Sequence, residues 1–188
     1  MNLPEQIVLR DRRMCMIDRM APEHANAYHV YQTTLAQETI YISTQPHEVK
    51  TTDVLAEQAR TFCDSPGHVW LAAFDADSGN IIADCMARCV LRDRMRHVAT
   101  IGVGVLESHQ RLGLGRALMN RIIDWASADG GTLKLQLSMF ADNTPAMKLY
   151  ESLGFKREGL RVGSFIQPDG TLHDEVLMGR WLGVRNEE

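Results

Sequence analysis

The sequence is short of positive charge and of long apolar runs, and each shortage excludes a class of protein. Lysine and arginine number 20 against 24 aspartate and glutamate residues, so the net charge is −4, whereas a domain that binds nucleic acid is expected to be basic. No apolar run approaches the roughly 20 residues that a membrane-spanning helix needs, and the polar stretch MNLPEQIVLRDRRM is unlike a signal peptide. We therefore expect a cytoplasmic protein without a nucleic-acid or membrane partner.

Paired cysteines and histidine motifs are also missing. The four cysteines (Cys15, Cys63, Cys85 and Cys89) include no Cys-x-x-Cys pair, and the seven histidines include no His-Glu-x-x-His. Structural zinc sites and zinc peptidases depend on such spacings. We therefore expect ordinary reduced thiols and no metal site.

What the chain does have is the composition of a folded globular protein. Its 188 residues are 45% hydrophobic and 23% charged, which suits one domain, 1–188, with a sizeable core. Apolar patterns and turn residues predict strands over 6–10, 68–75, 80–91, 96–106, 133–140, 155–166 and 172–182. Helical spacing predicts helices over 19–31, 51–63, 114–129 and 144–153. This order predicts an α/β protein with a mixed sheet rather than a strict βαβ alternation.

Two of the predicted helices have clear signals at their ends. Leu114 and Leu118 begin an apolar stripe that continues through the 114–129 helix, and the glycine pair at 130–131 is expected to end it. In the next helix Thr144 is the expected N-cap, Pro145 occupies the first helical position, and Gly154 follows the last turn. Both helices are thus predicted with their ends as well as their centres.

The stretch HQRLGLGRAL places Gly113 and Gly115 at the start of a helix, directly after a strand. Amides at a helix N-terminus have no partner within the helix and attract anions, and glycine lets a phosphate approach the backbone. Arg111 and Arg116 would add positive charge beside them. A P-loop is excluded because GxxxxGK[ST] is missing, and a dinucleotide fingerprint because Leu118 stands where a small residue is needed. The stretch predicts either a phosphate site of another kind or a simple glycine turn.

Two separate motifs match the patterns of one known family. Gln110-x-x-Gly113-x-Gly115, between a strand and a helix, is similar to the motif Q/R-x-x-G-x-G/A, and FADNTPAMKLYESLGFKREG (140–159) resembles N-x-x-A-x-x-L-Y-x-x-x-G-F. Both patterns belong to the GCN5-related N-acetyltransferase (GNAT) superfamily, and the resemblance runs from about 96 to 182. It implies the GNAT fold: a mixed central sheet of about six or seven strands with flanking helices. In that fold the two central strands, here 100–106 and 133–140, splay apart in a V.

The resemblance implies that acetyl-CoA, or another acyl-CoA, wedges into this splay as a cosubstrate. Backbone groups of Val103 and Val105 would pair with its pantetheine arm. Lys148 falls where relatives often place a basic residue near the cofactor, and a solvated helix charge fits that position equally well. The pyrophosphate would lie on the motif and helix start, formed by Gln110, Arg111, Leu112, Gly113, Leu114, Gly115 and Arg116.

The resemblance also implies catalytic roles. Tyr150 matches the tyrosine that protonates the leaving sulfur, and Asn143 matches an asparagine that orients the cofactor, although a plain N-cap role is open. Many relatives carry a glutamate near the position of Thr100, and this chain has none there. Glu38, in LAQETIYIS, resembles a segment on the substrate side. It would bind the substrate ammonium or relay its proton, unless it is only an exposed helix end.

These residues together imply an acetyl-CoA-dependent N-acetyltransferase. The acetyl group would pass directly to a primary amine, either of a small molecule or of a protein N-terminus. An acyl-CoA-binding sensor without turnover is the alternative: the missing strand glutamate favours it, and Tyr150 argues against it. By analogy with the superfamily we expect a homodimer.

Overall fold

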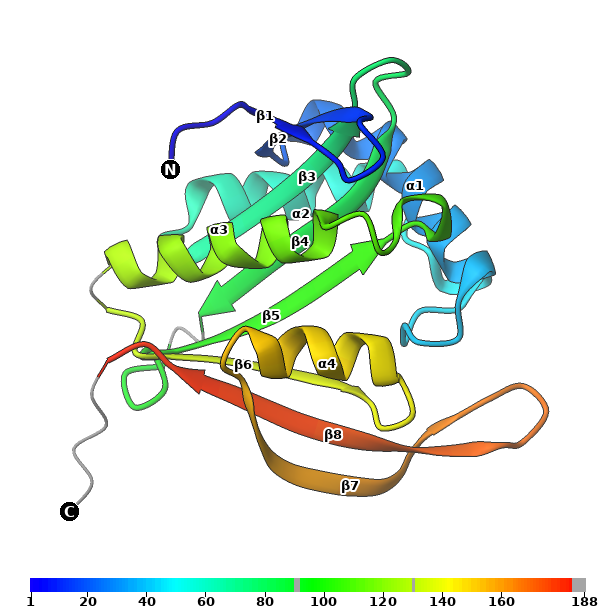
Figure 1. The fold of residues 1–188 in the computed structure, drawn as a ribbon, viewed down its shortest axis with the longest axis vertical. Helices are drawn as coiled ribbons and strands as arrows, with labels where there is room; N and C mark the ends of the chain where they lie inside the picture. Colours follow the sequence, from blue (N-terminus) through cyan, green and yellow to red (C-terminus); the bar gives the residue numbers. More distant parts are fainter. Residues whose placement is uncertain (90–91, 130, 184–188) are drawn as a thin grey trace.

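The computed structural model describes residues 1–89, 92–129 and 131–183, and in these ranges eight strands form one mixed sheet in the order β1-β2-β3-β4-β5-β6-β8-β7 (Figure 1). The strands are β1 (Glu5–Val8), β2 (Met14–Arg19), β3 (His68–Asp75), β4 (Ile81–Cys89), β5 (Val98–Val105), β6 (Lys134–Phe140), β7 (Lys156–Ile166) and β8 (Leu172–Trp181). All seven expected strands are present, and the last two residues of the 80–91 prediction lie outside the described residues, as does Gly130 of the glycine pair expected to end the 114–129 helix. The predicted α/β fold with a mixed sheet is confirmed.

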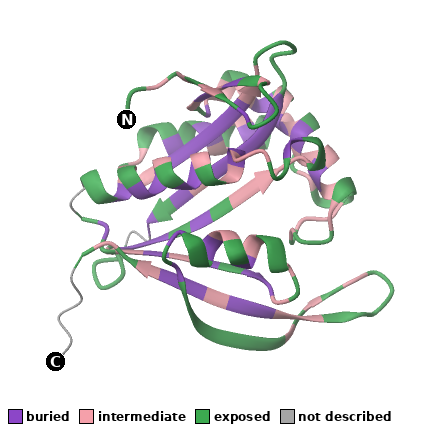
Figure 2. Cartoon of the chain, in the orientation of Figure 1, coloured by how far each residue is buried: buried purple, intermediate pink, exposed green. Residues whose placement is uncertain are grey.

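Helices cover both faces of the sheet. They are α1 (Ala25–Glu38), α2 (Thr52–Asp64), α3 (Leu114–Asp129) and α4 (Thr144–Ser152), with short 3-10 turns η1 (Pro22–His24), η2 (Pro46–Glu48) and η3 (Glu107–His109). Helices α3 and α4 lie on one face, and α1 and α2 lie on the other (Figure 1). Each pair of helices encloses its own cluster of buried apolar side chains. The strands between them, β3 and β4, are buried along most of their length (Figure 2).

The eighth strand, β2, is the element that the sequence pattern missed. The helix predicted over 19–31 is wrong at both ends, because the chain is still a strand up to Arg19, and the helix begins at Ala25 and continues to Glu38. Cys15 and Ile17 are both 0% exposed and alternate with the more accessible Met14 and Met16. Two buried positions are too few to establish an alternation from sequence alone.

The central strands β5 and β6 are parallel and separate soon after they begin. They pair only over Val98–Thr100 and Lys134–Gln136, whereas β4 stays paired with β5 as far as Val105 and β8 stays paired with β6 as far as Phe140. Beyond Thr100 the two strands therefore diverge, as the ribbon shows (Figure 1). The predicted V-shaped splay is confirmed.

A carboxyl group is buried between β4 and α1. Asp84 accepts hydrogen bonds from the Tyr31 hydroxyl (2.8 Å), the Tyr28 hydroxyl (3.2 Å) and the Trp70 indole nitrogen (2.9 Å). Burial raises the pKa of Asp84 to about 6 although these three donors lower it. Gly104 lies opposite Asp84 on β5, and a Cβ there would lie 2.5 Å from the Tyr31 hydroxyl. A glycine at this position is what lets the network close over β5.

Candidate functional site

The loop between β5 and α3 has the backbone shape of an anion site. Arg111 and Gly113 adopt positive φ angles of 61° and 94°, and the Gly113 carbonyl accepts the first helical hydrogen bond, from Ala117 (3.0 Å). The amides of Leu114, Gly115 and the following residue therefore have no partner within the helix. Successive turns of this kind direct amide hydrogens toward one point, where the positive end of the helix dipole adds to them.

Side chains fix this loop to its neighbours. The Gln110 amide nitrogen donates to the Val105 carbonyl at the end of β5 (3.1 Å). A Cβ on Gly115 would lie 3.5 Å from Leu149 and 3.7 Å from Val105, so the helix start packs closely between α4 and β5. Arg116 donates to the Ser152 hydroxyl on α4 (2.6 Å). The loop is thus held between the two elements that border the splay.

The two faces of β5 differ in burial, so that one face is packed against the apolar cluster and the other is accessible. A site where two substrates meet needs one accessible face of this kind. Val103 and Val105 are half-buried against the apolar cluster on the α3 side. Thr100 and Gly102 are exposed on the other face, where the nearest atom to a Cβ on Gly102 would be Met86 Cγ at 3.7 Å. The Thr100 hydroxyl accepts a hydrogen bond from Gln136 on β6 (3.1 Å). On this face, the strand beside the splay is therefore exposed and carries small side chains.

Tyr150 lies on α4 at the α3 side of the splay. It is 8% exposed and packs in the same cluster as Val103 and Val105, with its ring 6.0 Å from that of Phe155. Burial raises the pKa of its hydroxyl well above the ordinary value, and the neighbouring Cys85 thiol raises it further. The phenol therefore stays protonated, and able to donate a hydrogen bond, throughout the neutral and mildly alkaline range.

Asn143, and not Thr144, is the N-cap of α4. The Asn143 side chain accepts a hydrogen bond from the Ala146 amide (3.2 Å), which satisfies one of the unpaired donors of the first turn. The sequence prediction shifted the cap by one residue because threonine and asparagine are both good caps and stand side by side. Lys148 is exposed on the same helix.

Glu38 ends α1 and reaches the loop that follows β5. Its carboxylate accepts a hydrogen bond from the Glu107 amide (2.8 Å), at the first residue of η3. The side chain is exposed. Glu38 is thus close in space to the loop between β5 and α3, residues 106–113, which we call the phosphate-type loop. It reaches this loop although 69 residues separate it from Glu107.

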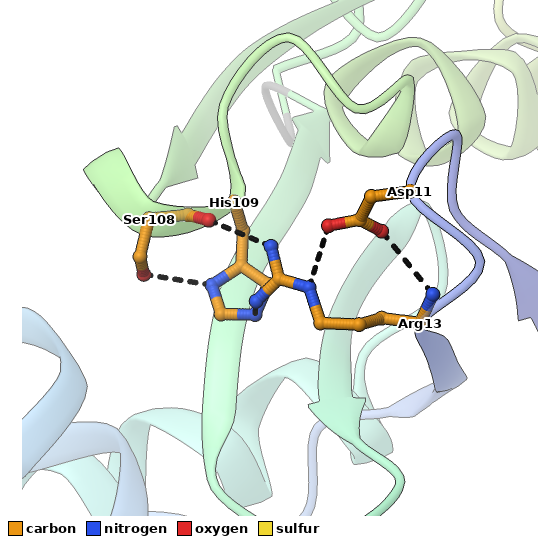
Figure 3. Close-up of polar contacts among 4 residues, drawn as sticks. All are labelled: Asp11, Arg13, Ser108 and His109. Atoms are coloured by element: carbon orange, nitrogen blue, oxygen red, sulfur yellow. Dashed lines mark hydrogen bonds and ion pairs between the residues drawn. The ribbon is translucent and has the colours of Figure 1, made fainter.

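Sequence reasoning missed the turn between β1 and β2, which contacts the loop between β5 and α3 through the four residues drawn in Figure 3. Arg13 bonds the His109 ring (2.8 Å) and the Ser108 carbonyl (2.9 Å), and Asp11 holds the Arg13 guanidinium (2.7 Å). Burial and the neighbouring Arg13 lower the pKa of His109, so the neutral ring accepts from Arg13 and donates to the Ser108 hydroxyl (2.9 Å). These partners are 96 residues apart, and nothing in the sequence pairs them.

Two features that would point to other functions, a metal site and a membrane-spanning helix, are not found among the described residues. In residues 1–89, 92–129 and 131–183, no three histidine, cysteine, aspartate or glutamate side chains are placed to hold a metal ion. None of the helices in these ranges is long and apolar enough to cross a bilayer.

The splay between parallel strands, bordered by an amide-rich loop and a buried tyrosine, has the arrangement that the resemblance to acyl-CoA-dependent acyltransferases of the GNAT superfamily implies. Comparison with known proteins agrees. The model of the Acetyltransferase (GNAT) family matches residues 22–155, and the chain belongs to this family. It is an N-acetyltransferase, and acetyl-CoA is the cosubstrate of this family.

Individual relatives support the assignment. The chain is 31% identical over 119 residues to the [ribosomal protein bS18]-alanine N-acetyltransferase of Escherichia coli (strain K12), covering 63% of this chain and 76% of the relative. It superimposes on a GNAT-family acetyltransferase from Streptococcus pneumoniae with a TM-score of 0.84 and 25% identity, over 89% of this chain and 99% of the other. The protein yncA from Salmonella typhimurium, solved with its cofactor acetyl-CoA, shares the fold with a TM-score of 0.79 and 20% identity. That match covers 93% of this chain and 97% of the other.

Proposed function

We propose that the chain transfers the acetyl group directly to a primary amine, of a small molecule or of a protein N-terminus, which approaches the Thr100 and Gly102 face of β5. The observation that carries this proposal is the pairing of β5 with β6 over three residues only, beside a loop with two positive-φ residues. The relative named for alanine acetylation of a ribosomal protein supports an α-amino group among the acceptors.

In this proposal acetyl-CoA occupies the splay from the α3 side. Its pyrophosphate lies on the loop amides from Arg111 to Arg116, with Lys148 nearby, and its pantetheine arm runs beside Val103 and Val105. The Gln110 side chain already uses one lone pair of the Val105 carbonyl, which leaves the second for the cofactor. Asn143 fixes the start of α4 and so the height of Tyr150 above the splay.

The reaction needs a neutral amine and a protonated leaving group. An alkylammonium with a pKa near 10.4 is only about 0.04% neutral at pH 7, so its proton must leave to Glu38 or to water before the nitrogen attacks. The neutral nitrogen then bonds the thioester carbon, and the carbon–sulfur bond of the tetrahedral adduct breaks. The Tyr150 hydroxyl donates its proton to the departing sulfur, and the nitrogen loses its second proton, which returns to the Tyr150 oxygen through solvent, so that the products are an amide and a free thiol. Because burial raises the pKa of Tyr150, its hydroxyl holds its proton at neutral pH and is available as a donor to the sulfur.

The test is thiol release from acetyl-CoA across a panel of primary amines, with wild type beside Tyr150→Phe. The substitution keeps the ring and removes only the proton donor. We expect turnover to fall about 100-fold while calorimetric affinity for acetyl-CoA stays within about twofold, because ring packing is unchanged.

Retained turnover in Tyr150→Phe would exclude the tyrosine as an essential acid. Tight acetyl-CoA binding by the wild type with no amine turned over would favour the acyl-CoA sensor instead.

We also propose a one-domain homodimer that works in the cytoplasm. Strand β7 is exposed along most of its length (Figure 2), and the β7–β8 hairpin exposes Leu160, Val162, Ile166 and Leu172 by 56–82% of their surface. Apolar side chains clustered at a sheet edge favour association with a second copy. Light scattering after gel filtration tests the dimer. The relative that acetylates a ribosomal protein supports the cytoplasm as the compartment.

A further inference from the structure

The turn between β1 and β2 lies against the phosphate-type loop, although it precedes the segment that the family model matches, 22–155. The Arg10 amide donates to the Leu112 carbonyl (3.2 Å), and Arg13 ties the turn to His109 and Ser108 (Figure 3). Backbone and side-chain bonds together therefore fix the turn to the loop. Family membership assigns no role to this contact.

The Arg10 side chain lies against Arg111 and Gly113 of the loop. Its guanidinium donates a long hydrogen bond to the Arg111 carbonyl (3.4 Å), and its Nε lies 4.0 Å from where a Cβ on Gly113 would be. That glycine is the N-cap of α3, so the guanidinium lies beside the unpaired amides of the helix start.

Arg10 and Arg13 differ in what neutralises them. Asp11 pairs with Arg13 at 2.7 Å, and the His109 and Ser108 contacts occupy the rest of that guanidinium. For Arg10, no carboxylate among the described residues lies within ion-pair distance. Arg13 thus positions the turn, and Arg10 keeps its charge and most of its donors for an anion.

We propose that Arg10 is a cofactor-binding residue whose guanidinium contacts the diphosphate of acetyl-CoA, so that the β1–β2 turn forms one wall of the site. This inference rests on the proposed position of the diphosphate on the loop amides. A guanidinium offers a planar pair of donors that match two phosphate oxygens, and such charge-assisted bonds are about twice as strong as neutral ones. The amides approach the diphosphate from the helix side, and Arg10 approaches it from the turn.

The test compares Arg10→Ala with Arg12→Asn. Arg12 is exposed in the same turn and carries the same charge. Its φ is 72°, a conformation that asparagine tolerates. The probes are CoA and 3′-dephospho-CoA, measured by titration calorimetry. We expect Arg10→Ala to weaken both ligands about tenfold, which corresponds to about 1.4 kcal/mol, and Arg12→Asn to change neither by more than about twofold. Arg10→Lys, which keeps the charge and loses the planar fork, should fall between wild type and Arg10→Ala.

The outcomes separate this inference from the proposed function. Unchanged affinity in both Arg10 variants, with normal binding by wild type, overturns the role of Arg10 and leaves the transferase proposal standing. A loss seen with CoA and absent with 3′-dephospho-CoA overturns the diphosphate assignment, because Arg10 would then contact the 3′-phosphate. Equal losses of affinity in Arg10→Ala and Arg12→Asn would show that only the net charge of the turn matters, and would overturn the specific contact. No binding of CoA by wild type would overturn both proposals.

Discussion

Replacing Asp84 by asparagine should change how the stability of the protein depends on pH. The carboxyl has a folded-state pKa of about 6 because of burial, against 3.8 for an ordinary aspartate. Between these values the folded state holds a proton that the unfolded state has lost, so the free energy of unfolding falls as pH rises. Each unit of pKa difference corresponds to about 1.4 kcal/mol, and the gap therefore amounts to about 3 kcal/mol, lost between pH 4 and pH 7.

The measurement is urea unfolding of wild type and Asp84→Asn at several pH values from 4 to 8. The difference between the two proteins cancels the other titrating groups, which both share. We expect wild type to lose about 3 kcal/mol relative to the variant over this range, and to change little above pH 7. Tyr28→Phe is an informative control, because removing a donor to the anion should raise the folded-state pKa of Asp84 and move the end of the window to higher pH.

A constant difference across the whole range would show that Asp84 does not titrate in the folded state near pH 6. A wild type that gains stability with pH relative to Asp84→Asn would show that the Tyr28, Tyr31 and Trp70 donors outweigh burial. Either result refutes the reasoning.

Two further variants probe the site. Gly113→Glu places a negative charge where the diphosphate is proposed to lie, and Gly113→Ala is its control because it has the same positive-φ strain. The Glu variant should bind acetyl-CoA at least tenfold more weakly than the Ala variant, a difference of about 1.4 kcal/mol. Equal affinities in calorimetry would show that the loop is not part of the site. Glu38→Gln should lower turnover mainly below the pKa of the amine and leave acetyl-CoA affinity unchanged. An equal loss at every pH would instead point to positioning through the Glu107 amide.

The elements that the sequence predicted well are those with signals at both ends. Helix α3 runs from Leu114 to Asp129 as expected, because the glycine loop marks its start and an apolar stripe runs through it. The splay came from the family resemblance and not from periodicity, since β5 and β6 look like ordinary strands when read singly.

What the sequence could not supply are contacts between distant segments. Asp84 stands in the apolar strand IIADCMARC, and its hydroxyl partners lie 53 and 56 residues earlier. The Arg13–His109 contact spans 96 residues. Residue type and local spacing carry no information on such pairs, because they are set by how the sheet is assembled.

The divergence of β5 from β6 gives the sheet two inner edges in addition to the outer ones of β1 and β7. An outer edge accepts any extended polypeptide, which is why exposed strand edges lead to aggregation. The inner edges lie in a wedge that closes at Thr100 and Gln136, where the strands reach the ordinary spacing of about 4.8 Å. An invading strand needs that spacing to a neighbour along its whole length and carries side chains on both faces. It therefore does not fit between two strands that diverge. In the proposed binding mode the wedge takes the thin pantetheine arm, which carries only a few isolated amides, and the same divergence protects the middle of the sheet from pairing with other chains.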